Sequence, residues 1–205
     1  MGLPKPYHET DLGRLYCADA LEILPHLETV DLVLTDPPYG IGISMNPFRQ
    51  KHEKSEWDNQ IPNVHIFDLM FEKSDQQIIW GGNFFPLPPP QGFLIWDKVQ
   101  PEDFSSSMCE FAWMSIKQPA KLFRRHVVSF SKLHPTQKPT ELMMWCLKFY
   151  RGNIGTVLDP FSGSGTTAVA CERLKRRWIG IEIEEKYCQI AVKRIEAERK
   201  QIKLF

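Results

Sequence analysis

Short apolar segments bounded by turn residues alternate with amphipathic segments along most of this chain, and this alternation constrains the fold more than any other feature. The run VDLVLT at 30–35 is typical of a buried strand because it is short, branched and apolar. The stretch 184–200 instead repeats apolar side chains at helical spacing, with charged residues opposite. Such alternation predicts an α/β fold with a mostly parallel central sheet and helices on both faces. We predict strands at 14–18, 30–35, 76–81, 92–98, 109–115, 156–159 and 178–183, and helices at 20–27, 64–73, 140–150, 166–175 and 184–200.

Length and composition favour one globular domain. The chain has 205 residues, 42% of them hydrophobic and 24% charged, which predicts a single domain over 1–205. Its five cysteines include no close pair, which excludes a Cys-x-x-Cys zinc or redox motif and favours a reducing compartment. The first residues lack the apolar segment of a secretory signal, and no segment has the length of a membrane span. We therefore expect a cytoplasmic protein with no membrane partner and no metal site.

A glycine-rich loop follows the predicted strand at 156–159 and leads into a helix. It carries Asp159 at the strand end, and the sequence from Gly163 to Ala168 matches the pattern G-x-G-x-x-G/A. Glycines let the backbone approach a ligand closely, and a helix N-terminus presents unpaired N–H groups to it. Glu182 ends the next strand, where an acid can hold ribose hydroxyls. By itself the loop fits a nicotinamide dinucleotide or another adenosine cofactor, and a plain turn is the structural alternative.

The sequence DPPY follows the predicted strand at 30–35 directly. Pro37 and Pro38 fix their φ angles and have no N–H, so the Asp36 carboxylate and the neighbouring carbonyl are held stiffly. These two acceptors can receive the two hydrogens of a planar amine while the Tyr39 ring stacks on its face. The arrangement would activate the exocyclic amine of a nucleobase, and a base in a duplex has to flip out to reach it. An ordinary proline turn is the alternative.

Three motifs together resemble a known enzyme family. DPPY at 36–39, HPTQKP at 134–139 and LDPFSGSGTT at 158–167 are similar to motifs of the S-adenosylmethionine-dependent DNA amino-methyltransferases, which methylate N6 of adenine or N4 of cytosine. The catalytic motif comes before the glycine loop, an order that resembles the β group of that family. The resemblance extends over about 14–195, through segments such as QIIWGGNFFP and GFLIWDK. It implies one Rossmann-like methyltransferase domain that uses S-adenosylmethionine.

The resemblance implies a catalytic role for the DPPY segment. Asp36 and the carbonyl of Pro37 would receive the target amino group, and Tyr39 would stack on the flipped base. Pro37 and Pro38 would keep this catalytic segment stiff. The sulfonium donor of the cofactor is already activated, so the resemblance implies neither a metal nor a covalent intermediate.

The resemblance also implies a cofactor site. Glu182 would hold the ribose and Asp19 the adenine end, while the glycine loop would surround the methionine part. Lys138 belongs to the family's TQKP segment, and we interpret it as a structural or cofactor-facing residue rather than as a general acid or base. The implied cofactor-binding residues are Asp19, Asp36, Thr136, Gln137, Lys138, Asp159, Phe161, Gly163, Ser164, Gly165, Thr166, Thr167, Glu182 and Ile183.

Basic residues cluster at 117–138, where no Asp or Glu occurs. This segment lies where the family inserts its target-recognition region, and binding to phosphates requires Lys and Arg. The recognition segment predicted here, about 116–133, is shorter than in many relatives. The loop at about 40–62 is either a lid over the flipped base or the DNA, or a surface loop. The predicted DNA-binding residues are Lys117, Lys121, Arg124, Arg125 and Lys132.

We predict an enzyme that methylates the N6 amino group of adenine in double-stranded DNA. In the family that the chain resembles, DPPY more often accompanies adenine and SPPY accompanies cytosine, so N4-cytosine is the alternative target. A nicotinamide-dependent oxidoreductase and a non-catalytic nucleic-acid-binding module are alternatives of other classes. A homodimer and a cognate restriction endonuclease are candidate partners, in a bacterial or phage-infected cell.

Overall fold

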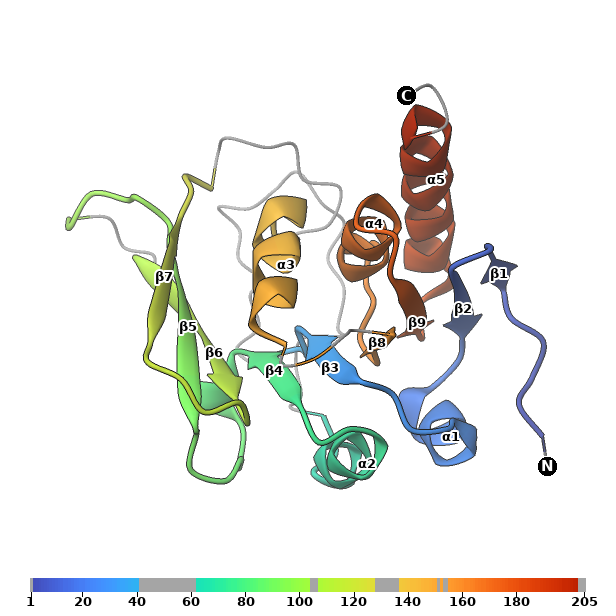
Figure 1. The fold of residues 1–205 in the computed structure, drawn as a ribbon, viewed down its shortest axis with the longest axis horizontal. Coiled ribbons are helices and arrows are strands. Elements are labelled where there is room, and N and C mark those ends of the chain that lie inside the picture. The colour runs from blue at the N-terminus through green and yellow to red at the C-terminus, as the bar shows by residue number, and fades with distance from the viewer. Residues whose placement is uncertain are drawn as a thin grey trace.

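One nine-stranded sheet organises the fold, with the strand order β1-β2-β9-β8-β3-β4-β6-β5-β7 (Figure 1). The computed structural model describes residues 2–40, 62–103, 107–127, 137–150, 152 and 155–202. All seven predicted strands are present, with small shifts at their ends. The strands are β1 (His8–Glu9), β2 (Gly13–Cys17), β3 (Leu32–Thr35), β4 (Gln77–Trp80), β5 (Gly92–Asp97), β6 (Cys109–Met114), β7 (Lys121–Arg124), β8 (Thr156–Asp159) and β9 (Arg177–Glu182).

Strand direction brings most strand ends to one edge of the sheet. β2, β9, β8, β3 and β4 pair in parallel in that order, whereas β6 runs antiparallel to both β4 and β5. β7 is parallel to β5, and the short β1 is antiparallel to β2. Seven strands therefore end at the same edge, and β6 begins there. Open α/β sheets bind their ligands at this edge, beyond the carboxyl ends of the strands.

Helices cover both faces of the sheet, as predicted. Figure 1 shows one group of helices above the sheet and another below it. The upper group is α3 (Thr140–Cys146), α4 (Thr166–Arg173) and α5 (Glu185–Ile202). The lower group is α1 (Ala20–Ile23) and α2 (His65–Lys73). The prediction of an α/β fold with a mostly parallel sheet between two helical layers is confirmed.

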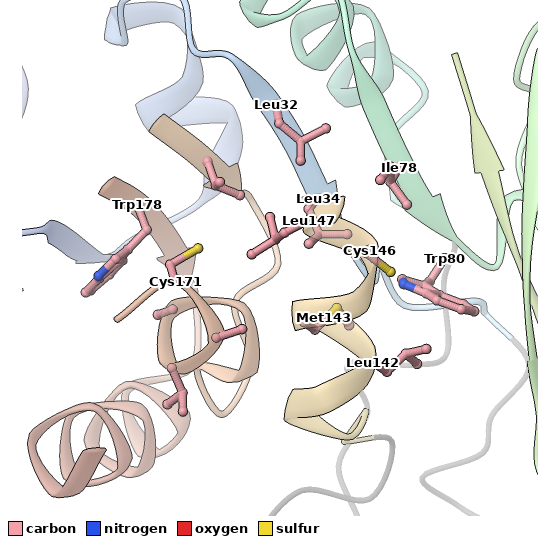
Figure 2. Packing of buried hydrophobic residues seen from close by; sticks show 14 of the residues in the cluster. Leu32, Leu34, Ile78, Trp80, Leu142, Met143, Cys146, Leu147, Cys171 and Trp178 are labelled. Carbon is pink, nitrogen blue, oxygen red and sulfur yellow. The ribbon is translucent and has the colours of Figure 1, made fainter. Parts of the chain in front are cut away.

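The core consists of two apolar clusters, one on each face of the sheet. Leu32 and Leu34 of β3 pack in the cluster that α3 and α4 cover, and Val33 between them packs in the cluster that α1 and α2 cover. Figure 2 shows the first cluster, in which Trp80 of β4 lies beside Cys146 of α3. Successive side chains of a strand point to opposite faces, so a continuous apolar run suits a strand that is buried on both sides.

α1 and α3 are each four residues shorter than predicted, α4 ends two residues early, and two strands lie outside the predicted set. α1 ends at Ile23 and passes into a 3-10 turn at Leu24–His26. Pro25 in this turn has no N–H and cannot continue the α-helical hydrogen bonds. α3 likewise ends at Cys146 and is followed by a 3-10 turn at Leu147–Phe149. β1 and β7 are short edge strands with polar ends, so they lack the apolar run that predicts a strand.

The described ranges contain neither a membrane-spanning helix nor a cluster of metal-binding side chains. Within them, no helix combines the length and the apolar character that crossing a membrane requires. The His, Cys, Asp and Glu side chains of the same ranges form no group of three or more that could hold a metal ion. That residues 1–205 form a single methyltransferase domain, and that the protein is cytoplasmic, stay predictions.

Candidate active site

Two strand ends meet at the centre of the carboxyl edge of the sheet. β3 ends at Thr35, directly before Asp36, and its neighbour β8 ends at Asp159. Thr35 Oγ1 donates a hydrogen bond of 2.7 Å to Asp159 Oδ1. The same Asp159 oxygen accepts a hydrogen bond of 3.2 Å from the backbone N–H of Phe161. The structure therefore brings the DPPY segment and the glycine loop side by side.

The glycine loop is held between β9 and α5. Gly163 N donates a hydrogen bond of 2.8 Å to Glu182 Oε2 at the end of β9. Gly165 has a φ of +76°, in the left-handed region that favours glycine. A Cβ at Gly165 would lie 2.8 Å from the Cβ of Ala191 in α5. Backbone conformation and close packing thus both require glycine at this position.

Arg194 of α5 supports the glycine loop from behind. Its Nη1 atom donates hydrogen bonds to the Ser164 carbonyl oxygen at 2.5 Å, to Ser164 Oγ at 2.8 Å and to Thr166 Oγ1 at 3.1 Å. Burial lowers the pKa of Arg194 to about 10, which leaves the side chain charged at neutral pH. Arg194 is not among the predicted site residues. Its position on the apolar stripe of the helix at 184–200, where a charge is out of place, is the signal that identifies it.

A cavity opens where the strand ends, the glycine loop and the beginning of α3 meet. Its wall contains most of the predicted cofactor residues and also Pro38. Gly165 is not part of the wall, and Thr136 lies outside the described residues. The predicted residues in the wall are Asp19, Asp36, Gln137, Lys138, Asp159, Phe161, Gly163, Ser164, Thr166, Thr167, Glu182 and Ile183. Sequence reasoning missed Ala18, Ala20, Met143, Pro160, Ser162, Glu184 and Tyr187.

Buried carboxyl groups dominate the chemistry of this cavity. Glu182 accepts backbone hydrogen bonds from Gly163 and Glu184 on its two oxygens, each 2.8 Å long. Burial outweighs these bonds and raises the pKa of Glu182 to about 7. Burial likewise raises the pKa of Asp159 to about 6, although hydrogen bonds from Thr167 and Thr35 oppose the change. The cavity therefore favours a ligand that brings positive charge and hydroxyl donors.

S-adenosylmethionine fits this set of side chains. It carries a sulfonium, an ammonium group and ribose hydroxyls, and Lys138 is the only basic side chain among the described residues of the wall. Ser162 Oγ, also in the wall, is buried and has no hydrogen-bond partner among the described residues, so it is available to a polar ligand group.

Asp36 belongs to a compact hydrogen-bonded cluster at the cavity wall. Lys138 Nζ donates to both carboxylate oxygens of Asp36 over 2.7 Å, and the Tyr39 hydroxyl donates to Oδ1 over 2.6 Å. Lys138 Nζ also lies 3.0 Å from the Tyr39 hydroxyl oxygen. Burial raises the pKa of Asp36, and the charge of Lys138 opposes that rise. Lys138 thus lines the cofactor cavity and contacts the candidate catalytic carboxylate as well.

The Tyr39 ring is fixed by aromatic neighbours. It stacks on Phe84 with ring centroids 5.0 Å apart, and it meets Phe85 edge-on at 6.1 Å. Gly81 has a φ of +68°, and a Cβ there would lie 2.1 Å from the Tyr39 ring. Pro37 of the same segment is buried. That Tyr39 stacks on a flipped base stays a prediction.

Two charged residues that sequence reasoning missed extend this cluster. Lys138 Nζ lies 2.9 Å from Glu110 Oε2, and Lys98 Nζ lies 2.7 Å from Glu110 Oε1. Burial by itself raises the pKa of Glu110, but Lys138 and Lys98 outweigh it and lower the pKa to about 2. Lys98 directly follows β5 and Glu110 is the second residue of β6, so both lie at the carboxyl edge, and nothing in the sequence distinguishes them from other charged residues at strand ends.

The predicted DNA-binding residues lie at the far edge of the sheet, around β7. Lys117, Lys121 and Arg124 are exposed, and Arg124 Nε pairs with Asp97 Oδ2 at 3.0 Å. Arg125 is partly buried and pairs with Glu141. Lys132 and nearly all of the predicted loop at about 40–62 lie outside the described residues.

Comparison with known proteins identifies relatives along almost the whole chain. The DNA methylase family of N6 and N4 methyltransferases matches residues 69–193, which is more than half of the chain. The type II methyltransferase M.ScaI of Streptomyces caespitosus is 26% identical over 98% of this chain and 86% of its own length. The type II methyltransferase M2.DpnII of Streptococcus pneumoniae is 27% identical over 96% of this chain and 94% of its own length.

Solved structures show the same fold. The complex of M1.HpyAVI with S-adenosylmethionine aligns with a TM-score of 0.62 and 25% identity, covering 90% of this chain and 100% of that protein. The cytosine-N4-specific PvuII DNA methyltransferase aligns with a TM-score of 0.65 and 18% identity over 97% of this chain and 95% of its own, a likeness of fold alone. The family match and the M1.HpyAVI complex show that S-adenosylmethionine is the cofactor, and the side chains of the cavity fit it. The chain belongs to the family of S-adenosylmethionine-dependent DNA amino-methyltransferases that act on N6 of adenine or N4 of cytosine.

Proposed function

We propose that this DNA amino-methyltransferase methylates the N6 amino group of an adenine that is flipped out of double-stranded DNA. The observation that carries the proposal is the Asp36 carboxyl group, which Lys138 and Tyr39 hold beside the cofactor cavity, where the motif begins with Asp rather than Ser. In the family, DPPY more often accompanies adenine. N4 of cytosine is the second candidate, because PvuII DNA methyltransferase, similar in fold, is cytosine-N4-specific.

The hydrogen bonds of Asp36 leave room for an amino group. A carboxylate offers about four acceptor positions on its two oxygens. Oδ1 accepts from Tyr39 and Lys138, whereas Oδ2 accepts from Lys138. Oδ2 therefore provides an acceptor position for one amino hydrogen, and the carbonyl oxygen of Pro37 provides a second acceptor. Two acceptors outside the plane of the base favour a pyramidal nitrogen, whose lone pair is then available for attack.

The residues of the site bind the cofactor, orient the target base and remove a proton from the methylated nitrogen. When bound, S-adenosylmethionine supplies a methyl group on a positively charged sulfur, which is an electrophile without help from a metal. Asp36, or water beside it, takes the proton that the methylated nitrogen releases. Tyr39 covers the face of the base, a contact worth about 1–3 kcal/mol. Glu182 holds the ribose, Asp19 the adenine end of the cofactor, and the glycine loop its methionine part.

The DNA lies, in this proposal, across the carboxyl edge towards β7. The exposed Lys117, Lys121 and Arg124 contact phosphates there, and Arg125 supports the same segment through Glu141. Because the recognition segment is short, we infer that much of the affinity comes from phosphate contacts rather than from base contacts. A homodimer and a cognate restriction endonuclease stay predictions.

Digestion of the methylated product tests the choice of base. The purified protein is incubated with double-stranded DNA and S-adenosylmethionine, and the DNA is digested to nucleosides for mass spectrometry. We expect N6-methyldeoxyadenosine and no N4-methyldeoxycytidine. The reverse result would overturn the proposed target base, and the absence of any methylated nucleoside with several DNA substrates would overturn the activity.

A further inference from the structure

We propose that Lys98 and Glu110 are positioning residues for methyl transfer, because they hold Lys138 in place against Asp36. The inference rests on the proposed role of Asp36 as the acceptor of the target amine. Four side chains of alternating charge connect in series, from Asp36 to Lys138, Glu110 and Lys98. Each step is an ion pair of 2.7 to 2.9 Å. We refer to these four residues as the charge row.

The charge row joins residues from three separate parts of the chain. Asp36 follows β3, Lys98 follows β5, Glu110 lies in β6 and Lys138 precedes α3. Glu110 is paired with Trp96 across β5 and β6, and Lys98 N donates to the Met108 carbonyl, so both residues sit on a fixed hairpin. The paired strands β5 and β6 thus hold the outer end of the charge row, and Lys138 connects that end to Asp36 at the cavity wall.

Burial makes the balance of charge in the row important. The side chain of Lys138 is 3% exposed and that of Lys98 is 10% exposed, and Glu110 and Asp36 are 21% and 18% exposed. Lys138 Nζ lies 5.7 Å from the centre of the Trp80 ring, and Lys98 Nζ lies at the same distance from the Trp96 ring. Two anions and two cations give zero net charge. Removing one member leaves a buried charge without its partner, which is costly.

Lys138 is shared between two carboxylates, so its hold on Asp36 depends on Glu110. Without the charge of Glu110, Lys138 interacts with Asp36 alone and favours its ionised form more strongly. Without Lys98, Glu110 interacts more strongly with Lys138, and Lys138 then favours the ionised form of Asp36 less. The other described groups that face this part of the site are the Tyr39 hydroxyl, Asp159 of β8 and the thiol of Cys146 in α3. The thiol is uncharged, because burial raises its pKa well above the ordinary value.

The pH dependence of methyl transfer tests the charge row. Asp36 accepts an amino hydrogen only when it is ionised, so the acidic limb of kcat/KM follows its pKa. We expect Glu110→Gln to move this limb to lower pH and Lys98→Met to move it to higher pH, each by about one pH unit. The double variant removes one charge of each sign and should return the limb close to that of the wild type. Lys98→Arg, which keeps the charge, should also behave like the wild type.

Matched controls separate positioning from general destabilisation. Glu9 and Arg14 form an exposed ion pair of 2.8 Å at β1 and β2, away from the cavity wall, so Glu9→Gln and Arg14→Met make the same changes elsewhere. We expect both controls to keep the wild-type limb. If Lys98→Met does not fold, the test compares Glu110→Gln with the double variant, because the acidic limb is expected at lower pH in the first and close to that of the wild type in the second.

The outcomes distinguish this inference from the proposed function. Shifts of opposite sign that cancel in the double variant support it. Limbs that stay fixed, or shift in the same direction, in variants that still produce the methylated nucleoside would overturn it while leaving the function intact. A product of N4-methylcytosine would change the target base without affecting the charge row.

Discussion

The buried carboxyl groups of Glu182 and Asp159 make the stability of the cofactor-free protein fall as pH rises through the weakly acidic range. Each has a pKa above its ordinary value because burial disfavours the ionised form. Between the ordinary pKa and the raised one, the folded protein holds a proton that the unfolded chain has released. The folded state therefore loses stability as pH rises through this window, and below it the contribution is fully present.

The magnitude follows from the size of the shifts. For Glu182 the pKa rises from 4.5 to about 7, which corresponds to roughly 3 kcal/mol of lost stability between pH 4.5 and 7. For Asp159 the rise from 3.8 to about 6 also corresponds to roughly 3 kcal/mol, lost between pH 4 and 6. A cationic cofactor prefers both groups ionised, so its affinity rises with pH. Between pH 6 and 8 we expect a roughly twentyfold gain, about tenfold from Glu182 and twofold from Asp159.

Calorimetric titration of S-adenosylmethionine at pH 6, 7 and 8, with thermal unfolding of the free protein at the same values, measures both effects. Glu182→Gln serves as the control, because it removes the larger titration while keeping a hydrogen-bond acceptor. We expect this variant to bind weakly and to show a flatter dependence of affinity on pH. An affinity that is constant from pH 6 to 8, or higher at pH 6, would refute the reasoning.

Three further substitutions test the loop and the tyrosine. Gly165→Ala should lower the free energy of unfolding by about 1–3 kcal/mol in chemical denaturation, and by more than Gly163→Ala, because only Gly165 faces Ala191 closely. Arg194→Met should raise KM for S-adenosylmethionine severalfold in steady-state assays with little change in kcat, since it loosens the loop alone; a selective fall in kcat would contradict this. Tyr39→Phe keeps the ring but removes the 2.6 Å hydrogen bond to Asp36, so single-turnover methyl transfer should slow about tenfold while cofactor affinity stays the same. A wild-type rate would show that the hydroxyl has no role.

The sequence predicts those features whose signal is local. The glycine loop lies within one strand–loop–helix unit, and its constraints can be read from Gly163 and Gly165 together with the strand that ends at Glu182. The alternation of predicted strands and helices also predicts the central sheet and its two helical layers. β3 and β8 pair in parallel, so Asp36 and Asp159 lie side by side at their carboxyl ends. Ligand sites of α/β sheets form at these strand ends.

The charge row could not be predicted in this way. Glu110 and Lys98 are ordinary charged residues at strand ends until the antiparallel register of β5 and β6 sets them side by side. Lys138 reaches Asp36 from 102 residues away. The same holds for β7, an exposed edge strand whose pairing with β5 decides its structure. Side chains that act through long-range contacts carry no periodic signal of their own.

Methyl transfer by Asp36→Asn, measured together with cofactor binding, tests the central claim most directly. Asn keeps the size of the side chain but loses the charge that receives the amine, and Lys138 retains Glu110 as its partner. We predict that the variant folds and binds S-adenosylmethionine nearly as well as the wild type, while transfer of a radiolabelled methyl group to double-stranded DNA falls by at least about a hundredfold. A wild-type rate of methyl transfer by this variant would contradict the account.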